Sequence, residues 1–348
     1  MNAFVMEPGA RRGLTREKSC EIGPLIVIPC LNEVHHIGGL LLQLVKAQQS
    51  IGGKIVVVDG GSTDGTQVAV GQIAANTDAV ILLDNPQKLQ SSAVNLAVDR
   101  YGDNTNYLIR IDAHASYPED YCQILLKEVK AQQADSIVVS MTAAGNPGFQ
   151  KINAAAQNSS VGNGGARHRN QSSGQFVEHG HHALMSIAAF QAVGGYDTGF
   201  SHNEDAELDY RLGKAGYRIW LTCKTQVTYY PRSSFSALAK QYYNFGKGRA
   251  KNNLKHRILP NKRQAIVTFV APAVLLAFLT VFHWIFAVPA LVWAGYCAVS
   301  GVKLAIKERE FSLVGTGVAA MLMHLAWSLG FWRNILFGFT GRQQGSTP

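Results

Sequence analysis

Apolar runs and amphipathic stretches alternate over the first 140 residues. Five short runs rich in β-branched residues predict buried strands: residues 24–29, 54–59, 79–83, 107–112 and 136–141. The stretches between them have helical spacing: residues 34–49, 67–75, 89–98 and 117–133. Alternating strands and helices predict an α/β fold, a mostly parallel sheet flanked by helices.

The pattern changes between residues 143 and 235. Residues 143–175 are rich in Gly, Asn, Gln and Ser, which predicts a long loop or a partly helical excursion. Regular patterning returns at residues 183–193. A helix is expected over residues 204–215, and a strand is expected to begin at residues 217–222.

Apolar segments dominate the end of the chain. Residues 265–288, 289–302 and 313–332 contain no Asp, Glu, Lys or Arg. Because about 20 apolar residues span a bilayer as a helix, we expect two to three transmembrane helices, the first two forming a hairpin. Buried helices of a soluble protein are the alternative.

The net charge of +9 is concentrated just before these segments. Residues 240–263 hold eight Lys or Arg, and no Asp or Glu occurs between Tyr210 and Lys307. A basic segment next to apolar helices favours contact with anionic lipid at a cytoplasmic membrane surface. Nucleic-acid binding is disfavoured, since no nucleic-acid-binding motif is present.

The chain thus divides into four predicted regions. They are a disordered tail at 1–23, an α/β domain at 24–235, a basic juxtamembrane segment at 236–264 and a membrane domain at 265–348. The tail lacks the apolar run of a signal peptide, and the five scattered cysteines favour reduced thiols. A chain ending near residue 262 is expected to be soluble, or to be released from membranes by salt.

Two polar motifs follow the first two strands. The first is Pro29-Cys30-Leu31-Asn32-Glu33, and the second runs from Asp59 to Thr66 as DGGSTDGT. A carboxylate among glycines and hydroxyls can accept a hydrogen bond from a nucleotide base or a ribose. A helix cap at Asn32 and a turn capped by Asp64 are the alternatives. Neither GxGxxG nor a P-loop motif occurs.

Two further motifs carry acidic residues. Asp112 and His114 should share one face of a strand, where they could hold Mg²⁺ or Mn²⁺ with diphosphate oxygens; a capping Asp and an exposed His are the alternative. In Asn203-Glu204-Asp205, Asp205 could act as a general base, or the acidic turn could complement a helix dipole. For the histidines of EHGHH, structural or acceptor-side roles are favoured over a metal cluster.

Taken in order, these motifs resemble the family 2 glycosyltransferases of the GT-A fold over residues 24–235. PCLNE, VDGGSTDGT, the D-x-H motif and GGYD…NEDAELDYRLGKAGYRIW carry the resemblance, which is greatest to succinoglycan-type exopolysaccharide glucosyltransferases. It implies that Pro29, Asn32, Glu33 and Asp59 line a nucleotide pocket. It also implies that Asp112 contacts the ribose or the diphosphate and binds metal with His114, and that Asp205 is the base.

The resemblance further implies a reaction and a location. A sugar, by this likeness glucose from UDP-glucose, would pass with inversion to a polyprenyl-diphosphate-linked saccharide. The catalytic domain would face the cytoplasm at a bacterial inner membrane. His114 stands where Asp is commoner, and no QxxRW motif is present, which favours transfer of a single sugar. A membrane-associated nucleotidyltransferase and a non-catalytic nucleotide-binding scaffold remain the alternatives.

Overall fold

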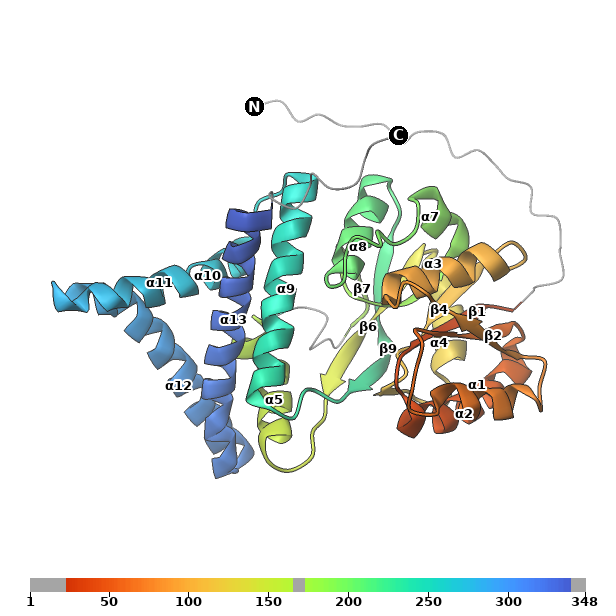
Figure 1. Ribbon diagram of the computed structural model, residues 1–348, viewed down its shortest axis with the longest axis horizontal. Coiled ribbons are helices and arrows are strands. Elements are labelled where there is room, and N and C mark those ends of the chain that lie inside the picture. The colour runs from red at the N-terminus through yellow and green to blue at the C-terminus, as the bar shows by residue number, and fades with distance from the viewer. Residues whose placement is uncertain (1–22, 165–172, 339–348) are drawn as a thin grey trace.

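The computed structural model describes residues 23–164 and 173–338. The predicted disordered tail, apart from Gly23, lies outside the described residues. Within these ranges the strands form a single nine-stranded sheet, with helices packed on its two faces (Figure 1). We call β1 to β9 with the helices between them the sheet domain.

The sheet is parallel on one side and mixed on the other. Its strands are β1 (Leu25–Cys30), β2 (Lys54–Asp59), β3 (Val80–Asp84), β4 (Tyr107–Arg110), β5 (Ala115–Ser116), β6 (Ser136–Ala143), β7 (Gln175–Val177), β8 (His181–Ser186) and β9 (Ile219–Tyr229). Their order is β3-β2-β1-β4-β8-β6-β9-β5, with β7 also on β9. The four strands β3, β2, β1 and β4 pair in parallel, as predicted. β8 is antiparallel to both β4 and β6.

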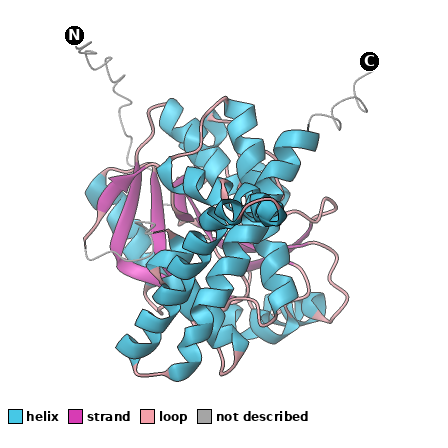
Figure 2. Cartoon of the chain, turned by 90° about the vertical axis from the view of Figure 1, so that its left-hand side faces the viewer, coloured by secondary structure: helices cyan, strands magenta, loops and turns pink. Residues whose placement is uncertain are grey.

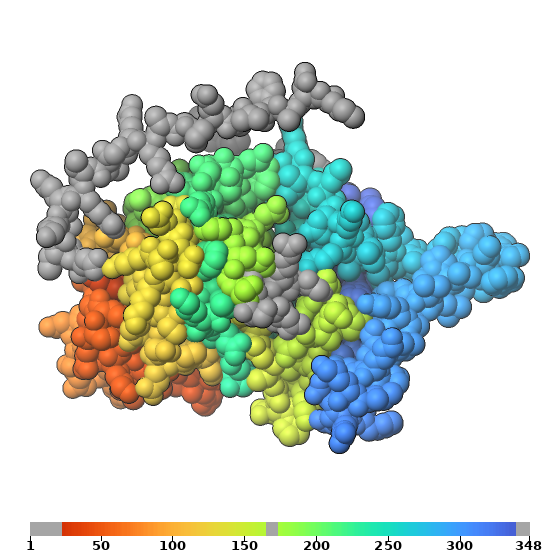
Figure 3. Space-filling view, turned by 180° about the vertical axis from the view of Figure 1, so that it is seen from behind, coloured from red at the N-terminus to blue at the C-terminus, as the bar shows by residue number. Residues whose placement is uncertain are grey.

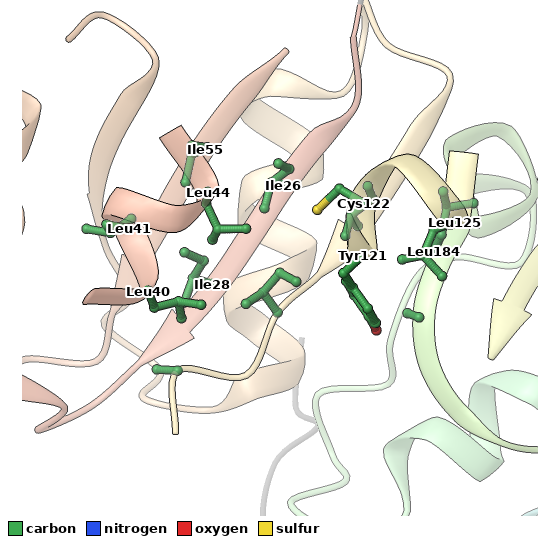
Figure 4. Packing of buried hydrophobic residues seen from close by; sticks show 14 of the residues in the cluster. Ile26, Ile28, Leu40, Leu41, Leu44, Ile55, Tyr121, Cys122, Leu125 and Leu184 are labelled. Atoms are coloured by element: carbon green, nitrogen blue, oxygen red, sulfur yellow. The ribbon is translucent and has the colours of Figure 1, made fainter. Parts of the chain in front are cut away.

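The segments between the strands form helices, because their apolar residues recur at helical spacing and lie on one face. They are α1 (Val34–Ile51), α2 (Thr66–Ala74), α3 (Gln90–Tyr101), α4 (Tyr121–Gln132), α5 (Phe149–Asn158), α6 (Ser160–Asn163), α7 (Ile187–Ala192) and α8 (Glu204–Lys214). In α1, Leu40, Leu41 and Leu44 pack on Ile28 and Ile55 of the sheet (Figure 4). Burying a leucine side chain stabilises the fold by about 1.5–3 kcal/mol, so this face fixes α1 against β1 and β2.

Among the residues that the structure describes, three helices are long and apolar enough to cross a membrane. They are Lys262–Val281, which contains α10 (Lys262–Thr268) and α11 (Val270–Ala277), Trp284–Glu308, which contains α12 (Val288–Glu308), and Phe311–Phe337, which contains α13 (Gly315–Phe337). In the apolar 18-residue stretch of each helix, only 17% of the first and 11% of the second are buried, against 50% of the third. The first two, which we call the apolar hairpin, project from the body (Figure 3), while α13 lies between the hairpin and α9 (Figure 1).

The segment predicted as a basic juxtamembrane region is mostly a helix, α9 (Phe235–His256), which packs along α13. A Cβ added at Gly246 of α9 would lie 1.9 Å from the carbonyl oxygen of Trp327, and one at Gly330 the same distance from that of Tyr243. These glycines let the two backbones touch. One basic side chain of α9 forms ion pairs with the sheet domain. Lys255 pairs there with Asp197 at 2.7 Å and with Glu207 at 2.5 Å.

The two legs of the apolar hairpin meet α13 at different heights. Ser328 and Trp332 of α13 each donate a hydrogen bond of 2.8 Å to the carbonyl oxygen of Thr268 in the first leg. The second leg crosses α13 at Gly317, where an added Cβ would lie 2.5 Å from the carbonyl oxygen of Cys297. Eleven helical residues separate Gly317 from Ser328, about 16 Å. The two legs of the hairpin and α13 therefore form a triangle with α13 as its base (Figure 1). In the view from the hairpin's side, helices cover most of the molecule's front (Figure 2).

Candidate active site

The loops after β1 and β2 are tied together by hydrogen bonds. Asn32, with φ of 56°, accepts from the Thr63 N–H at 2.9 Å through its side chain, and its own N–H donates to Ser62 Oγ at 2.8 Å. The N–H of Glu33 donates to Thr66 Oγ1 at 2.9 Å. The left-handed backbone at Asn32 suits an asparagine, which tolerates it better than most residues. The two predicted nucleotide-binding motifs thus form one rigid edge at the carboxyl ends of parallel strands, where α/β sheets bind ligands.

Asp59 is fully buried at the end of β2 and holds its own loop. Its Oδ2 accepts from the N–H groups of Gly61 and Ser62 at 2.9 and 2.8 Å and from Gln67 Nε2 at 2.6 Å. Burial alone would raise the pKa of Asp59, but hydrogen bonds from Ser62 and Gln67 outweigh it and lower the pKa below its ordinary value. Asp59 therefore stays ionised and organises the turn.

Glu33 links the first loop to the D-x-H motif. Its Oε1 lies 2.9 Å from Nδ1 of His114, and its Oε2 lies 2.9 Å from Nδ1 of His36. His114 is half exposed, with 48% of its side chain accessible. Two of the predicted site residues, Glu33 and His114, are therefore in contact, and Asp112 lies two residues before His114 in the chain.

The expected placement of Asp112 and His114 on one face of a strand is wrong. β4 ends at Arg110, and both residues lie in the turn between β4 and β5. The Asp112 N–H donates to the Tyr117 hydroxyl at 2.7 Å, which holds the turn. The Asp112 carboxylate accepts from Gln90 Nε2 at 3.2 Å and lies 3.6 Å from Nε2 of His181. The alternation rule does not apply to Asp112 and His114, because the strand ends two residues earlier than predicted.

Asp205 meets a buried arginine that the sequence reasoning passed over. Arg110 donates to both carboxylate oxygens of Asp205, at 2.5 and 3.2 Å. Burial would raise the pKa of Asp205, but the guanidinium of Arg110 beside it, with His182 farther away, drives the pKa well below its usual range. The signal in the sequence was a lone basic residue inside an otherwise apolar strand run, YLIRID, which requires a buried partner.

A chain of buried hydrogen bonds continues from Asp205 into the core. The Tyr196 hydroxyl lies 3.1 Å from Asp205 Oδ1 and 2.6 Å from Nδ1 of His182. His182 Nε2 in turn lies 2.7 Å from Oδ1 of Asp209, whose Oδ2 lies 2.7 Å from Nδ1 of His179. We call these five residues, from Asp205 to the partly exposed His179, the relay. The EHGHH histidines are thus split between the relay and Asp112 and form no metal cluster of their own.

The antiparallel strand β8 explains how these groups come together. Ile109 of β4 pairs with Leu184 of β8, so the start of β8, with His181 and His182, lies beside the end of β4, with Arg110. Asp205 lies in the first turn of α8 at the same edge. Its neighbour Glu204 lies in a different electrostatic setting, since burial and the adjacent charge of Asp205 raise the pKa of Glu204 to about 7.

Known proteins resemble this chain over most of its length. A family model described as "Glycosyl transferase family 2" matches residues 25–194. The chain is 53% identical over 312 residues to the succinoglycan biosynthesis protein ExoA of Rhizobium meliloti, across 90% of this chain and 94% of the relative.

Two more distant likenesses have a similar extent. A dolichyl N-acetyl-alpha-D-glucosaminyl phosphate 3-beta-D-2,3-diacetamido-2,3-dideoxy-beta-D-glucuronosyltransferase of Methanococcus voltae is 22% identical, across 90% of this chain and 97% of the relative. Among solved structures, the mannosyltransferase PcManGT from Pyrobaculum calidifontis, in complex with GDP-Man and Mn²⁺, has a TM-score of 0.57 at 16% identity. That likeness covers 91% of this chain and 88% of the other, and it shows the fold.

The expected fold and enzyme class are therefore confirmed over the nucleotidyltransferase and scaffold alternatives. The sheet of parallel strands flanked by helices, the loops at its carboxyl edge and the long match to ExoA agree. This chain belongs to glycosyl transferase family 2 and is a glycosyltransferase of the GT-A fold.

Proposed function

We propose that the enzyme transfers one sugar, with inversion, from UDP-glucose to a saccharide carried on a polyprenyl diphosphate. We place the reaction in exopolysaccharide synthesis at the cytoplasmic face of a bacterial inner membrane. The relative ExoA supports the pathway class by its printed name. The apolar hairpin supports a membrane location, and the eight basic residues before it support the cytoplasmic side.

The observation that carries the mechanism is the pair Arg110–Asp205. Two donors on one guanidinium fix both carboxylate oxygens, so Asp205 is held ionised in a single orientation. In the proposed step an acceptor hydroxyl attacks the anomeric carbon of the donor sugar. Asp205 takes the hydroxyl proton as the new carbon–oxygen bond forms, and the bond to the diphosphate breaks. The nucleoside diphosphate leaves with that electron pair, and the configuration inverts.

The linked loops after β1 and β2 would hold the nucleotide. Pro29 near the end of β1, with Asn32 and Glu33 in the loop after it, would face the nucleotide, while Asp59 keeps the second loop in shape through three donors to its Oδ2. Because these groups are already fixed by one another, little ordering remains to be done when a nucleotide binds.

We expect Asp112 and His114 to hold a divalent ion together with oxygens of the substrate. Within residues 23–164 and 173–338 no group of three or more His, Cys, Asp or Glu side chains that could hold a metal ion comes together. Asp112 and His114 would supply two ligands, leaving positions for diphosphate oxygens, a shell that suits Mg²⁺ or Mn²⁺. When bound, such an ion neutralises charge on the departing diphosphate. We expect His114→Ala to weaken Mn²⁺-dependent UDP binding in calorimetry, and full activity in excess chelator would remove the metal role.

A product assay tests the whole proposal. The full-length protein in detergent is given a panel of nucleotide sugars together with polyprenyl-diphosphate saccharides, and the product's sugar and anomeric configuration are determined. Transfer of a single glucose with inversion is expected. Transfer only to free saccharides would contradict the lipid-linked acceptor, and retention of configuration would contradict the direct displacement.

A further inference from the structure

A hollow lies where the sheet domain, α9 and the end of α13 meet. Its volume is about 460 Å³, within the range of roughly 300–1,000 Å³ typical of small-molecule sites. The lining comes from the loop of residues 199–202, from α9 between Asn244 and Lys251, and from the last turn of α13 at Arg333 and beyond. We call it the basic hollow.

The charged groups of the basic hollow are all cationic. Lys247, Lys251 and Arg333 line it, together with the amides of Asn244 and Asn334, and no Asp or Glu is among its described lining residues. Lys251 also donates to the carbonyl oxygen of Gly199 and lies 4.5 Å from the ring centre of Phe200, which fixes its stem at the rim. Two lysines and an arginine around amide donors match phosphate oxygens, which accept several hydrogen bonds at once.

The basic hollow also lies at the ends of apolar helices. Arg333 belongs to α13. The residue before it, Trp332, donates a hydrogen bond to the carbonyl oxygen of Thr268, near the start of the apolar hairpin. The hairpin's first leg begins at Lys262, and long helices of this kind begin and end at the level of lipid head groups. A ligand in the basic hollow would therefore be held where the phosphate groups of a lipid lie.

The loop that lines the basic hollow runs directly into the predicted base. His202 lines the hollow, Asn203 precedes α8, and Asp205 is the second residue of that helix. α9 clamps this loop: Asn203 Nδ2 donates to the carbonyl oxygen of Phe245 at 3.0 Å, and a Cβ at Gly248 would lie 2.4 Å from that of His202. Three residues of chain reach at most about 11 Å, so His202 in the lining of the hollow lies no farther than that from Asp205.

We propose that the basic hollow binds the phosphate groups of the lipid-linked acceptor, and so presents the attached saccharide to Asp205. This inference rests on the proposed function, because it assumes a diphosphate-linked lipid acceptor. Lys247 and Arg333 contact the acceptor's phosphates, while the nucleotide sugar binds at the separate edge formed by the loops after β1 and β2.

The test compares three variants of the full-length protein in the same detergent. Lys247→Gln and Arg333→Gln each remove one cation of the hollow, and Lys240→Gln removes an exposed cation of the same helix outside it. We expect the KM for a polyprenyl-diphosphate saccharide to rise about tenfold or more in the first two and to stay within twofold in the third. The Kd for UDP should be the same in all, which shows that folding and the donor site are intact.

Direct binding identifies the ligand chemistry. Farnesyl diphosphate, inorganic pyrophosphate and vesicles of phosphatidylcholine with phosphatidylglycerol serve as probes. Farnesyl diphosphate should bind the wild type and Lys240→Gln and lose about tenfold affinity in the two hollow variants. The two hollow variants could instead weaken vesicle binding more than farnesyl diphosphate binding. That result would assign the hollow to bulk anionic lipid and overturn the proposal. Farnesyl diphosphate binding that is unchanged in both hollow variants would also overturn it, whereas pyrophosphate binding that weakens in the same two variants would support the contact with phosphate groups.

Failure of this inference can be told from failure of the proposed function. If the wild type glucosylates lipid-linked saccharides and the hollow variants keep the KM of Lys240→Gln, the basic hollow is not the acceptor site and the proposed function stands. If the wild type uses no diphosphate-linked acceptor but glucosylates another saccharide, both are overturned.

Discussion

At the scale of single residues, Asp205 and Glu204 are neighbours with opposite electrostatic settings. Arg110 keeps Asp205 ionised, whereas burial and Asp205 raise the pKa of Glu204 to about 7. We expect Asp205→Asn to lower kcat by at least about 10²-fold, the lower end of what a general base contributes. The Kd for UDP should change little, as measured by calorimetry. Near-normal turnover in Asp205→Asn, with loss in Glu204→Gln, would move the role of base to Glu204.

His182 allows a prediction about pH and stability. Burial lowers its pKa, but the charges of Asp209 and Asp205 outweigh burial and raise it above the usual value. A raised pKa contributes stability that is fully present below about pH 6.5, the unfolded value, and is lost as pH rises through the folded pKa. His182→Gln breaks this buried pair, so we expect a loss of about 3–5 kcal/mol at pH 6. The difference in stability between His182→Gln and the wild type should become smaller towards pH 9.

The measurement is the melting midpoint in one detergent at pH 6, 7.5 and 9. His35→Gln is a control, because His35 is exposed in α1. Asp209 does not confuse the trend, since its pKa is lowered and its contribution is lost only in acid. A gap that is constant or that widens with pH would show that His182 is neutral in the folded protein.

Individual residues were predictable from the sequence only where local motifs carry them. Asn32, Glu33 and Asp59 lie at the edge that the strand-end rule predicts. The partners of Asp205 were not predictable, because Arg110, Tyr196 and His182 come from three separate segments that meet only through the antiparallel pairing of β4 and β8. Local pattern cannot show which distant strand will lie beside another.

At the scale of elements, the crossing of α9 and α13 depends on two glycines. A Cβ at Gly246 would lie 1.9 Å from a carbonyl oxygen of α13, so Gly246→Ala must push the helices apart. We expect a loss of about 1–3 kcal/mol, as for other overpacked sites. Gly39→Ala is the matched control: nothing lies within 4 Å of its Cβ, and the change in α1 should stabilise by about 0.4–1 kcal/mol. Melting in detergent measures both, and a Gly246→Ala midpoint at or above the wild type would contradict the crossing.

The same crossing changes an expectation drawn from the sequence. A chain ending near residue 262 was expected to be soluble or loosely bound. It would lose α13, however, and expose Ala156 of α5 and Leu238 of α9, which are buried with Ala319 and Met323. Such a chain should aggregate. The length and hydropathy of the apolar segments were predictable, but the docking of α13 on a basic helix was not, because its buried side is set by the partner rather than by its own composition.

At the scale of the whole molecule, α13 touches the body along its full length. Glu310, just before it, pairs with Lys151 of α5 at 2.6 Å, His324 lies 2.9 Å from the carbonyl oxygen of Val161, and Gly330 abuts α9. A helix with both ends on one body does not carry its C-terminus across a bilayer. We therefore expect the C-terminus to lie on the same side of the membrane as the sheet domain, with only the apolar hairpin inserted.

Protease protection of epitope tags measures this arrangement. One tag follows Pro348, and another is inserted at His283, between the two legs of the hairpin. In sealed inside-out vesicles, the C-terminal tag should be cut together with the sheet domain while the tag at His283 is protected. Cleavage of the C-terminal tag in right-side-out vesicles instead would show that α13 crosses the membrane.

The triangle of apolar helices also has a consequence for synthesis. α9 ends at His256, but the helix that covers it ends at Phe337, some 80 residues later in the chain. At about 5–20 residues per second, a ribosome needs roughly 4–16 s to make that stretch, and the hairpin emerges in between. If the hairpin inserts as proposed, the nascent enzyme enters the bilayer with one flank uncovered and finishes folding only when its last helix arrives. Premature termination anywhere in that interval leaves an uncovered flank for chaperones and proteases to recognise, so we expect the cell to accumulate mainly copies that carry the complete α13.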